Sequence, residues 1–530
     1  MSISKMYVRL ILVTSLVSSL VLLAQGISTG QAPKQGGTYT VAIESKISNL
    51  DPQYSGGPNQ RIWATFYENL ITKDIEGNIQ PALATDWEWV DKRHLRFKLR
   101  KGVKFTTGRK FDADAVVASF KRALNPEDPH QFFGFTKWIK SVQKEDEYTV
   151  VIETDRDYPM ATDYLCSTES GVIVDAKAAE DWGDLKTRDA GTGPFTLDEW
   201  VPGQYVRLKR NEEYWGKKPN IEYLVFRYIP EPAAQVLALE KGEIDGIFNC
   251  PPAMVPRLKE NPNVNVITYP YRRKVTIEMN FLKPIFRDHP KIRKAISLAI
   301  DTVSITENIV GIKAIPADSV VTDQAFGYYG YGFPEYNPQI AELLLEEEGW
   351  VDTDGDGIRD KDGKPFEITY ATDIRRDYRN RDVAVAVQSY LKEVGIKVNL
   401  ELVERAPFVD IVVNKGEHDM CTQGWSNQSG EASWDTYLRL HSDSQDLGTW
   451  GTPRTRRAEI DAMIEQAMSV YDREEQEVWW EIVQRKIYNE TLIIPLYFVR
   501  QITALRTRVH DYAKVPHEYW QYRYIDVWVE

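Results

Sequence analysis

The hydrophobic pattern along the chain switches repeatedly between a period of two and a period near 3.6, which are typical of strands and of amphipathic helices. We predict strands over residues 37–43, 94–99, 205–209, 221–227, 366–371, 397–402 and 493–498. We predict helices over residues 60–70, from Asp112 to about 124, over 289–301 and over 455–489, the last broken near Asp472. This mixture predicts an α/β protein.

Composition narrows the class of protein. The chain has 530 residues, 42% of them hydrophobic, which is enough for a large core and too few for a protein with many membrane spans. The formal net charge is −13 and no Lys/Arg-rich run occurs, so we expect no nucleic-acid partner. The 15 Trp and 28 Tyr suit either the core or a pocket that stacks on a ligand.

Residues 1–30 have the pattern of a signal peptide. Lys5 and Arg9 precede an apolar run over 10–24, and small residues follow it. No cysteine follows the run, so we expect a periplasmic or otherwise extracytoplasmic protein that is not lipid-anchored. Cys166, Cys250 and Cys421 could form one disulfide, but we favour buried free thiols.

Six blocks of sequence carry a resemblance to a known family. They are residues 82–105 (ALATDWEWVDKRHLRFKLRKGVKF), 110–124 (KFDADAVVASFKRAL), 191–200 (GTGPFTLDEW), 238–245 (ALEKGEID), 289–301 (HPKIRKAISLAID) and 343–357 (LLLEEEGWVDTDGDG). In this order they resemble the peptide/nickel-type extracytoplasmic solute-binding proteins, family 5, including the oligopeptide-, dipeptide- and glutathione-binding members. One departure is Thr107-Gly108, where the family commonly has Asp-Gly.

The resemblance implies a two-lobed α/β periplasmic-binding-protein fold of type II, cluster C. Lobe I would comprise residues 31–70, 185–272 and 498–530, with a subdomain inserted at 71–184, and lobe II would comprise 273–497. It also implies a substrate-binding protein of an ABC importer, a monomer that captures a small peptide or peptide-like solute in the cleft and delivers it to a membrane permease. Opines, oligosaccharides and metal chelates are the alternative solutes.

The sequence contains none of the motifs GxxxxGK[ST], GxSxG and HExxH, and no GxGxxG follows a strand. The seven histidines lack metal-site spacing. A secreted hydrolase is therefore the less favoured alternative, and no cofactor is expected.

One motif resembles a calcium loop. Asp352, Asp354 and Asp356, with Asp360, have the spacing of EF-hand ligands, but position 12 is Gly363 where a bidentate Glu is expected. We favour a β-turn between a helix and a strand, with a structural Ca²⁺ as the alternative.

A loop at 424–438 (GWSNQSGEASWDTYL) is the first predicted wall of the ligand site. The family implies that an acidic residue here receives a peptide α-amino group; the usual acidic run is missing, and the segment is similar to that of the glutathione-binding members. Asp435 is our first candidate for this contact and Glu431 the second. Trp425, Ser426 and Trp434 would complete this wall.

The second predicted wall comes from other parts of the chain. Tyr54 and Asn59 lie in the polar loop after the first strand, and Phe133 and Tyr497 align loosely with pocket walls of the family. Arg273 and Arg405 are candidates for a carboxylate clamp, because a guanidinium presents a planar fork to two oxygens.

Overall fold

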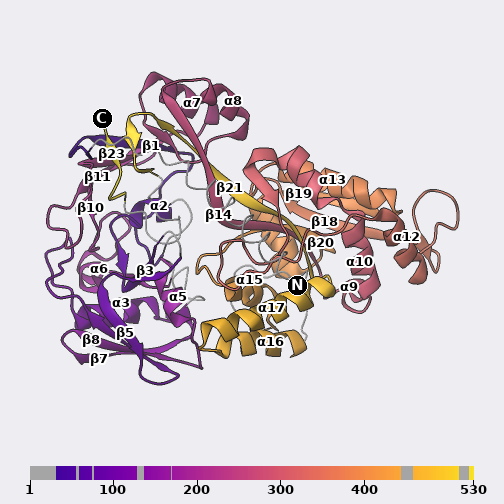
Figure 1. The fold of residues 1–530 in the computed structure, drawn as a ribbon, viewed down its shortest axis with the longest axis horizontal. Helices are drawn as coiled ribbons and strands as arrows, with labels where there is room; N and C mark the ends of the chain where they lie inside the picture. Colours follow the sequence, from indigo (N-terminus) through magenta and orange to yellow (C-terminus); the bar gives the residue numbers. More distant parts are fainter. Residues whose placement is uncertain are drawn as a thin grey trace, which may run out of the picture.

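The computed structural model describes residues 32–54, 59–74, 77–127, 136–168, 170–442, 458–512 and 524–530. Two α/β lobes lie side by side, and two long strands run from one into the other (Figure 1). The prediction of a two-lobed α/β fold is confirmed. Residues 1–31 lie outside the described residues, so the signal peptide stays a prediction.

One eleven-stranded sheet extends through both lobes. Its order is β10-β11-β12-β1-β13-β21-β14-β20-β18-β19, with β15 paired to β21. The strands of lobe I are β10 (Phe195–Val201), β11 (Tyr205–Arg210), β12 (Tyr223–Tyr228), β1 (Thr38–Ile43) and β13 (Gly246–Ile247). Those of lobe II are β15 (Ala314–Pro316), β20 (Met420–Ser426), β18 (Glu367–Asp373) and β19 (Lys397–Val403).

The two crossing strands are β14 (Val264–Met279) and β21 (Ile493–Arg506), which pair antiparallel. The predicted domain boundaries at 272/273 and 497/498 fall inside them; the division into domains stays a prediction. The register shifts between Pro270, opposite Arg500, and Lys274, opposite Phe498. Extra residues in one strand form a bulge, which interrupts the ladder and increases the local twist. The crossing is therefore least regular midway between the lobes.

A separate four-stranded sheet forms the unit that we predict as the inserted subdomain. Its order is β5 (Ala84–Trp89), β6 (His94–Leu99), β8 (Thr149–Thr154) and β7 (Ile139–Asp146), with helix α3 (Ala113–Ala123) packed on it. The Asp112 side chain caps α3 by accepting a hydrogen bond from the Ala115 amide. Four two-stranded sheets complete the strands: β2 (Glu68–Asn69) with β9 (Val172–Ile173), β3 (Ile71–Lys73) with β4 (Ile79–Pro81), β16 (Asp360–Lys361) with β17 (Lys364–Pro365), and β22 (Val509–His510) with β23 (Trp528–Val529).

The other α-helices of the described residues surround these sheets. They are α2 (Gln60–Trp63), α5 (Ala161–Cys166), α6 (Ala176–Trp182), α7 (Pro232–Lys241), α8 (Val255–Lys259), α9 (Pro284–Arg287), α10 (Pro290–Ala299), α11 (Thr302–Ile305), α12 (Pro338–Glu347), α13 (Asn380–Glu393), α14 (Arg405–Val409), α15 (Ala432–Leu440), α16 (Ala458–Ser469) and α17 (Arg473–Asn489). Within the described part of the chain no single helix is long and apolar enough to cross a membrane; only the bent pair Pro290–Ala299 and Thr302–Lys313, which meet at 47°, passes on length and composition.

The predicted helix over 60–70 is wrong in its extent. Only Gln60–Trp63 is helical, and the chain then enters β2 at Glu68. Phe66 and Leu70 are nevertheless fully buried. The turn and the short strands that follow α2 direct both side chains into the core. The predicted break near Asp472 is confirmed, since Asp472 caps α17.

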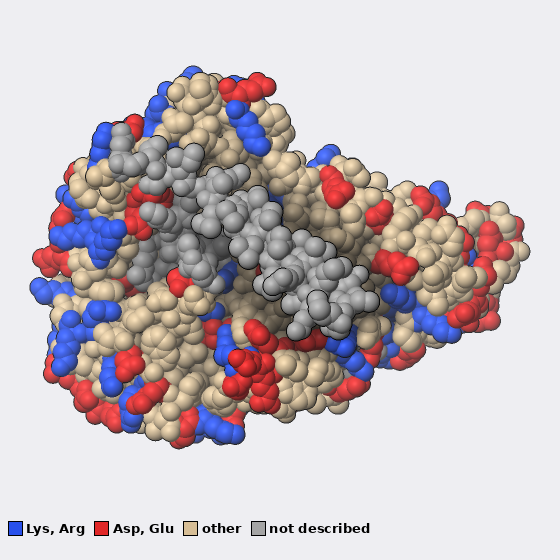
Figure 2. Space-filling model, viewed as in Figure 1, with Lys and Arg blue, Asp and Glu red and all other residues tan. Residues whose placement is uncertain are grey.

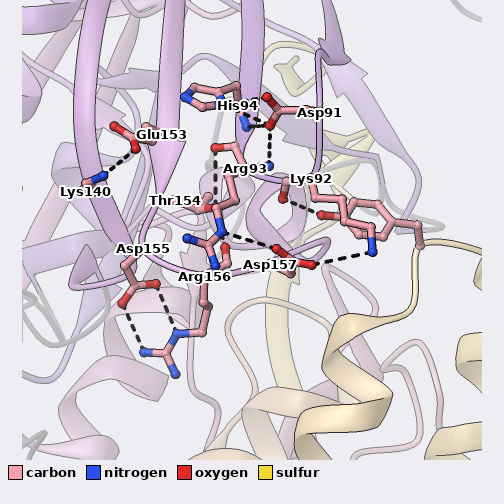
Figure 3. A network of polar contacts seen from close by, with 11 residues as sticks. Asp91, Lys92, Arg93, His94, Lys140, Glu153, Thr154, Asp155, Arg156 and Asp157 are labelled. Atoms are coloured by element: carbon pink, nitrogen blue, oxygen red, sulfur yellow. Dashed lines mark hydrogen bonds and ion pairs between the residues drawn. The ribbon is translucent and has the colours of Figure 1, made fainter.

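The inserted subdomain also packs against lobe II. The buried apolar cluster of the subdomain continues into lobe II through Tyr164 and Trp434, whose rings lie 5.3 Å apart. At the subdomain edge, Lys92 and Arg93 both pair with Asp157 (Figure 3), and the Lys92 carbonyl accepts a 2.6 Å hydrogen bond from the Tyr471 hydroxyl of lobe II. The two lobes thus contact each other beyond the crossing strands.

Candidate functional site

The central cavity, a space of about 1000 Å³, is lined by both lobes. Lobe I contributes residues around Glu44, Arg61 and Asn249. Lobe II contributes the loop 373–379, Arg405, Ser426 and Tyr497 among others. Figure 2 shows acidic and basic side chains interspersed over this face of the molecule.

Three neighbouring strands of lobe II end at this cavity. Strands β18, β19 and β20 pair parallel, so their carboxyl ends lie at the same edge of the sheet. The loop after β18 begins at Asp373, Arg405 follows β19, and Ser426 ends β20. Ligands of open α/β sheets commonly bind outside the carboxyl ends of the strands, so this edge is the expected place for a site.

Arg273 lies on β14, opposite Ser426 at the end of β20, and its guanidinium is held in place at this edge. Its guanidinium donates to both oxygens of Asp377, with nitrogen to oxygen distances of 2.7 and 3.0 Å, and to the Ser426 hydroxyl at 3.3 Å. Such a bidentate pair fixes orientation as well as charge. A Cβ atom built on Gly424 would clash with the ends of the Arg273 and Asp377 side chains, so a larger residue there would displace this ion pair.

Two further guanidiniums lie close to Arg273. Arg376 donates to the Gly424 carbonyl at 3.3 and 3.2 Å, and Arg405 lies 3.7 Å from Asp373. Burial, followed by the positive charge of Arg273, lowers the pKa of Arg376 to about 9. Burial also lowers the pKa of Arg405, with Asp373 opposing the shift. This wall is therefore electrostatically positive.

Tyr497 comes from the crossing strand β21 and lines the same cavity. Its side chain is 1% exposed, and among the described residues its hydroxyl has no hydrogen-bond partner. Burial raises the pKa of Tyr497 well above its usual value, so the hydroxyl keeps its proton and remains a donor.

Two further cations, Arg61 of lobe I and Lys313 of lobe II, line the central cavity. Arg61, on α2, lies 3.4 Å from Glu44 and has its guanidinium 4.1 Å from the centre of the Phe248 ring. Lys313 of lobe II donates a 2.6 Å hydrogen bond to Asn249 of lobe I, so it joins the lobes across the cavity.

Comparisons with known proteins agree with this architecture. Residues 78–446 match the family model of bacterial extracellular solute-binding proteins, family 5 (middle). The chain belongs to this family. It is therefore a solute-binding protein and not an enzyme, so the hydrolase alternative is set aside.

The relatives of this family 5 protein include peptide-binding proteins. The oligopeptide-binding protein AppA of Bacillus subtilis is 28% identical over 504 residues, which cover 91% of this chain and 90% of AppA. Its structure in complex with a nonapeptide has a TM-score of 0.75 and covers 94% of this chain and 100% of that one. The glutathione-binding protein GsiB of Escherichia coli O157:H7 is 26% identical, covering 88% of this chain and 89% of GsiB. NikA of Brucella suis in complex with Fe(III)-EDTA has 25% identity and a TM-score of 0.81, covering 93% of this chain and 100% of NikA.

Four of the site residues predicted for this family 5 protein line the central cavity: Arg273, Arg405, Ser426 and Tyr497. Sequence reasoning missed Arg376 and Asp377, which belong to the run DIRRDYR at 373–379. The sequence did contain a signal for this run, because charged residues that directly follow a predicted buried strand lie at the edge of the sheet where ligands bind.

The predicted residues near the first strand lie elsewhere. Tyr54 lines a different cavity, of about 1080 Å³, and the Arg122 guanidinium lies 4.8 Å from the centre of its ring. Asn59 is buried, and its side chain accepts a hydrogen bond from the Ser48 amide, so it holds the loop in place. Phe133 lies outside the described residues.

The two predicted tryptophans pack within the protein. The Arg439 guanidinium lies 3.4 Å from the centre of the Trp425 ring. The Trp434 indole is 3% exposed and donates to the Ser426 carbonyl at 3.0 Å, while its ring contacts Tyr164 of the subdomain. Neither side chain is part of the central cavity wall.

Glu431 lies in a buried group of charges between the subdomain and lobe II. Its carboxylate is 2.9 Å from Arg473 and 3.9 Å from Lys73, and Lys73 in turn is 2.7 Å from Asp163. Burial, followed by the charge of Asp163, raises the pKa of Glu431 to about 8. A third cavity, of about 740 Å³, adjoins this group of charges.

Asp435 requires a correction, because the structure gives its carboxylate partners inside the protein. One oxygen lies 2.7 Å from the Lys274 ammonium, and the other accepts hydrogen bonds from the Thr322 amide, the Thr322 hydroxyl and Asn427 at 2.8–3.1 Å. Asp435 and Lys274 are 1% and 2% exposed, and Asp435 lies outside the central cavity wall. We therefore no longer place Asp435 at a ligand ammonium.

The aspartate loop between α12 and β16 forms a turn. The carboxylates of Asp352, Asp354 and Asp356 lie within 4.8 Å of one another and are exposed. Asp352 accepts hydrogen bonds from the amides of Gly355 and Gly357, and Asp360 accepts one from the Thr353 hydroxyl. These bonds account for the turn without an ion, so a structural Ca²⁺ stays a prediction.

The three cysteines are free and buried, as we favoured from their spacing. Burial raises the pKa of Cys250, which lines the central cavity, to about 11. This thiol is therefore protonated at neutral pH and poorly nucleophilic.

Proposed function

We propose that this protein is the exported, monomeric substrate-binding component of an ABC importer. It captures a small peptide or peptide-like solute in the central cavity and delivers it to a membrane permease. The observation that carries the proposal is a cavity of about 1000 Å³ walled by two lobes that β14 and β21 connect. A volume of this size accommodates a ligand of several residues.

The relatives support a peptide as the first solute class and a metal chelate as the second. AppA is named an oligopeptide-binding protein and GsiB a glutathione-binding protein. NikA was solved with Fe(III)-EDTA, a polycarboxylate chelate, and the arginine-rich wall of the cavity would suit such an anion.

Ligand identity is tested by mass spectrometry of solute retained through purification, followed by thermal-shift measurements. The panel contains di- to pentapeptides, glutathione, opines, oligosaccharides and ferric EDTA. A true ligand at 100 times its Kd should stabilise the fold by about 2.7 kcal/mol. A panel in which no peptide stabilises the protein would reject the peptide proposal.

We expect ligand to draw the lobes together about the bulge between Pro270 and Lys274. Closure excludes water and completes the site from both lobes. Small-angle scattering should give a smaller radius of gyration at ligand saturation. An unchanged radius of gyration at saturation would contradict a hinge at this position.

A further inference from the structure

The central cavity carries a charge opposite to that of the whole protein. Its described wall includes Arg61, Arg273, Arg375, Arg376, Arg379 and Arg405 with Lys313. The carboxylates of the same wall are Glu44, Asp373, Asp377 and Glu404. The wall is therefore net positive, whereas the chain has a formal net charge of −13. A cleft lined by one sign of charge concentrates solutes of the other sign.

The positive charge is densest at the ends of β18 and β19, where Arg376 and Arg405 lie close to Arg273 of β14. Asp377 holds Arg273 in a bidentate pair. Asp373 lies 3.7 Å from Arg405 and also accepts a hydrogen bond from the Arg375 amide. Arg376 donates to a neutral carbonyl, that of Gly424. The positive charge of Arg273 disfavours the charged forms of both Arg376 and Arg405, so a third anion here would relieve a repulsion already present.

A second, independent observation points to the same place. The Tyr497 hydroxyl is buried and has no hydrogen-bond partner among the described residues, and Tyr497 is one of the residues that line the cavity. A buried donor without a partner is costly, so such groups commonly meet a ligand or water. Tyr497, Arg273 and Asp377 line the same cavity.

We propose that the cavity selects a solute carrying at least two carboxylates, one of which binds Arg376, Arg405 and the Tyr497 hydroxyl. The second carboxylate would face Arg61 and Lys313 on the other side of the cavity. This inference rests on the proposed function and narrows its solute class to acidic peptides and other polycarboxylates. A ligand that spans both groups of cations contacts both lobes.

The test compares matched probes by titration calorimetry at low ionic strength. L-glutamyl-L-glutamate and L-glutaminyl-L-glutamine have the same termini and nearly the same shape, and they differ in side-chain charge. We expect the acidic dipeptide to bind about 10- to 100-fold more tightly, the range for removing charge-assisted hydrogen bonds. Tricarballylate, a tricarboxylate without an amino group, tests the anion site independently of peptide capture.

Single substitutions in the cavity wall test which residues produce the preference for the acidic dipeptide. Arg376→Gln and Arg405→Gln should each reduce the ratio of the two dipeptide affinities by about tenfold, and Tyr497→Phe should reduce it by a smaller factor. Arg257→Gln removes the same charge from an exposed pair with Glu240, outside the cavity wall, and should leave the ratio unchanged. A ratio does not depend on the fraction of protein that is folded, so loss of stability cannot imitate the result.

The outcomes separate this inference from the proposed function. Measurable and equal affinities for the two dipeptides would overturn the inference and leave peptide capture standing. Binding of tricarballylate when neither dipeptide binds would support the anion site and reject peptide capture. Binding of none of the three probes would overturn the anion site.

Discussion

Asp435→Asn is expected to destabilise the folded protein by about 3–5 kcal/mol, the usual cost of removing one partner of a buried ion pair. The substitution keeps the shape of the side chain but leaves the Lys274 ammonium, which is 2% exposed, facing an amide. Burial already lowers the pKa of Lys274, and the charge of Asp435 opposes that shift. Urea denaturation followed by tryptophan fluorescence gives the free energy of unfolding directly.

Asp410→Asn is the matched control for this variant. It removes a carboxylate from an exposed pair with Lys415 in the same lobe, which should cost about 1 kcal/mol or less. Ligand affinity is measured for both variants under conditions where they are folded. Unchanged stability of Asp435→Asn together with lost affinity for a free α-amino group would restore the role at a ligand ammonium that we withdrew.

The stability of the protein should fall between about pH 4.5 and pH 8 through Glu431. Burial raises the pKa of this carboxyl from 4.5 to about 8, and Asp163 acts in the same direction. A group whose pKa is raised on folding stabilises most below its unfolded pKa, and this contribution is lost as the pH rises through the folded pKa. The shift corresponds to at most about 5 kcal/mol over the full range.

Charged groups of both the subdomain and lobe II surround Glu431 and contribute to its pKa. Lys73 and Asp163 of the subdomain face Glu431 and Arg473 of lobe II, and Arg272 interacts with both carboxyls. The pKa of Asp163 is lowered, chiefly by Lys73 and Arg473 against the opposing effect of burial. Its own contribution is therefore present above its unfolded pKa and is lost only at lower pH, outside this window.

The variant Glu431→Gln isolates the effect, because a neutral amide cannot lose a proton. The difference in unfolding free energy between the parent and Glu431→Gln should change with pH, and the parent should lose stability relative to the variant as the pH rises. Glu459→Gln, in an exposed pair with Lys486, is the control and should track the parent. Parallel profiles for the parent and Glu431→Gln would show that Glu431 titrates near its ordinary pKa.

The structure places two of the predicted ligand-site residues at the cavity, and their role in binding stays a prediction. Arg273 and Arg405 were predicted as a carboxylate clamp, and both line the cavity. However, Arg273 is already held by Asp377, more than a hundred residues away along the chain. The sequence indicates that an arginine can bind an anion, but whether a protein carboxylate engages it first depends on which loops the fold brings together.

The loop at 424–438 shows why acidic residues were harder to assign. Glu431 and Asp435 are both acidic residues in a loop rich in tryptophan, and from the sequence we ranked Asp435 first and Glu431 second for the contact with a ligand ammonium. Their partners decide their roles: Asp435 faces Lys274 inside lobe II, and Glu431 faces Lys73 of the subdomain. Both partners are remote in sequence, and local pattern does not report them.

The sequence by itself determined the alternation of strands and helices, the cap at Asp112 and the break near Asp472, because periodicity and capping are local properties that each segment carries. The family followed from the resemblance of six sequence blocks. Local pattern predicted β21 only over 493–498, whereas the strand runs from Ile493 to Arg506 because it pairs with β14 along the whole crossing. Only the tertiary structure brought the carboxyl ends of β18, β19 and β20 to one edge and placed Tyr497 beside them. Sheet pairing and burial act between segments hundreds of residues apart, and they decide which charged side chains reach the cavity and which are neutralised within the protein.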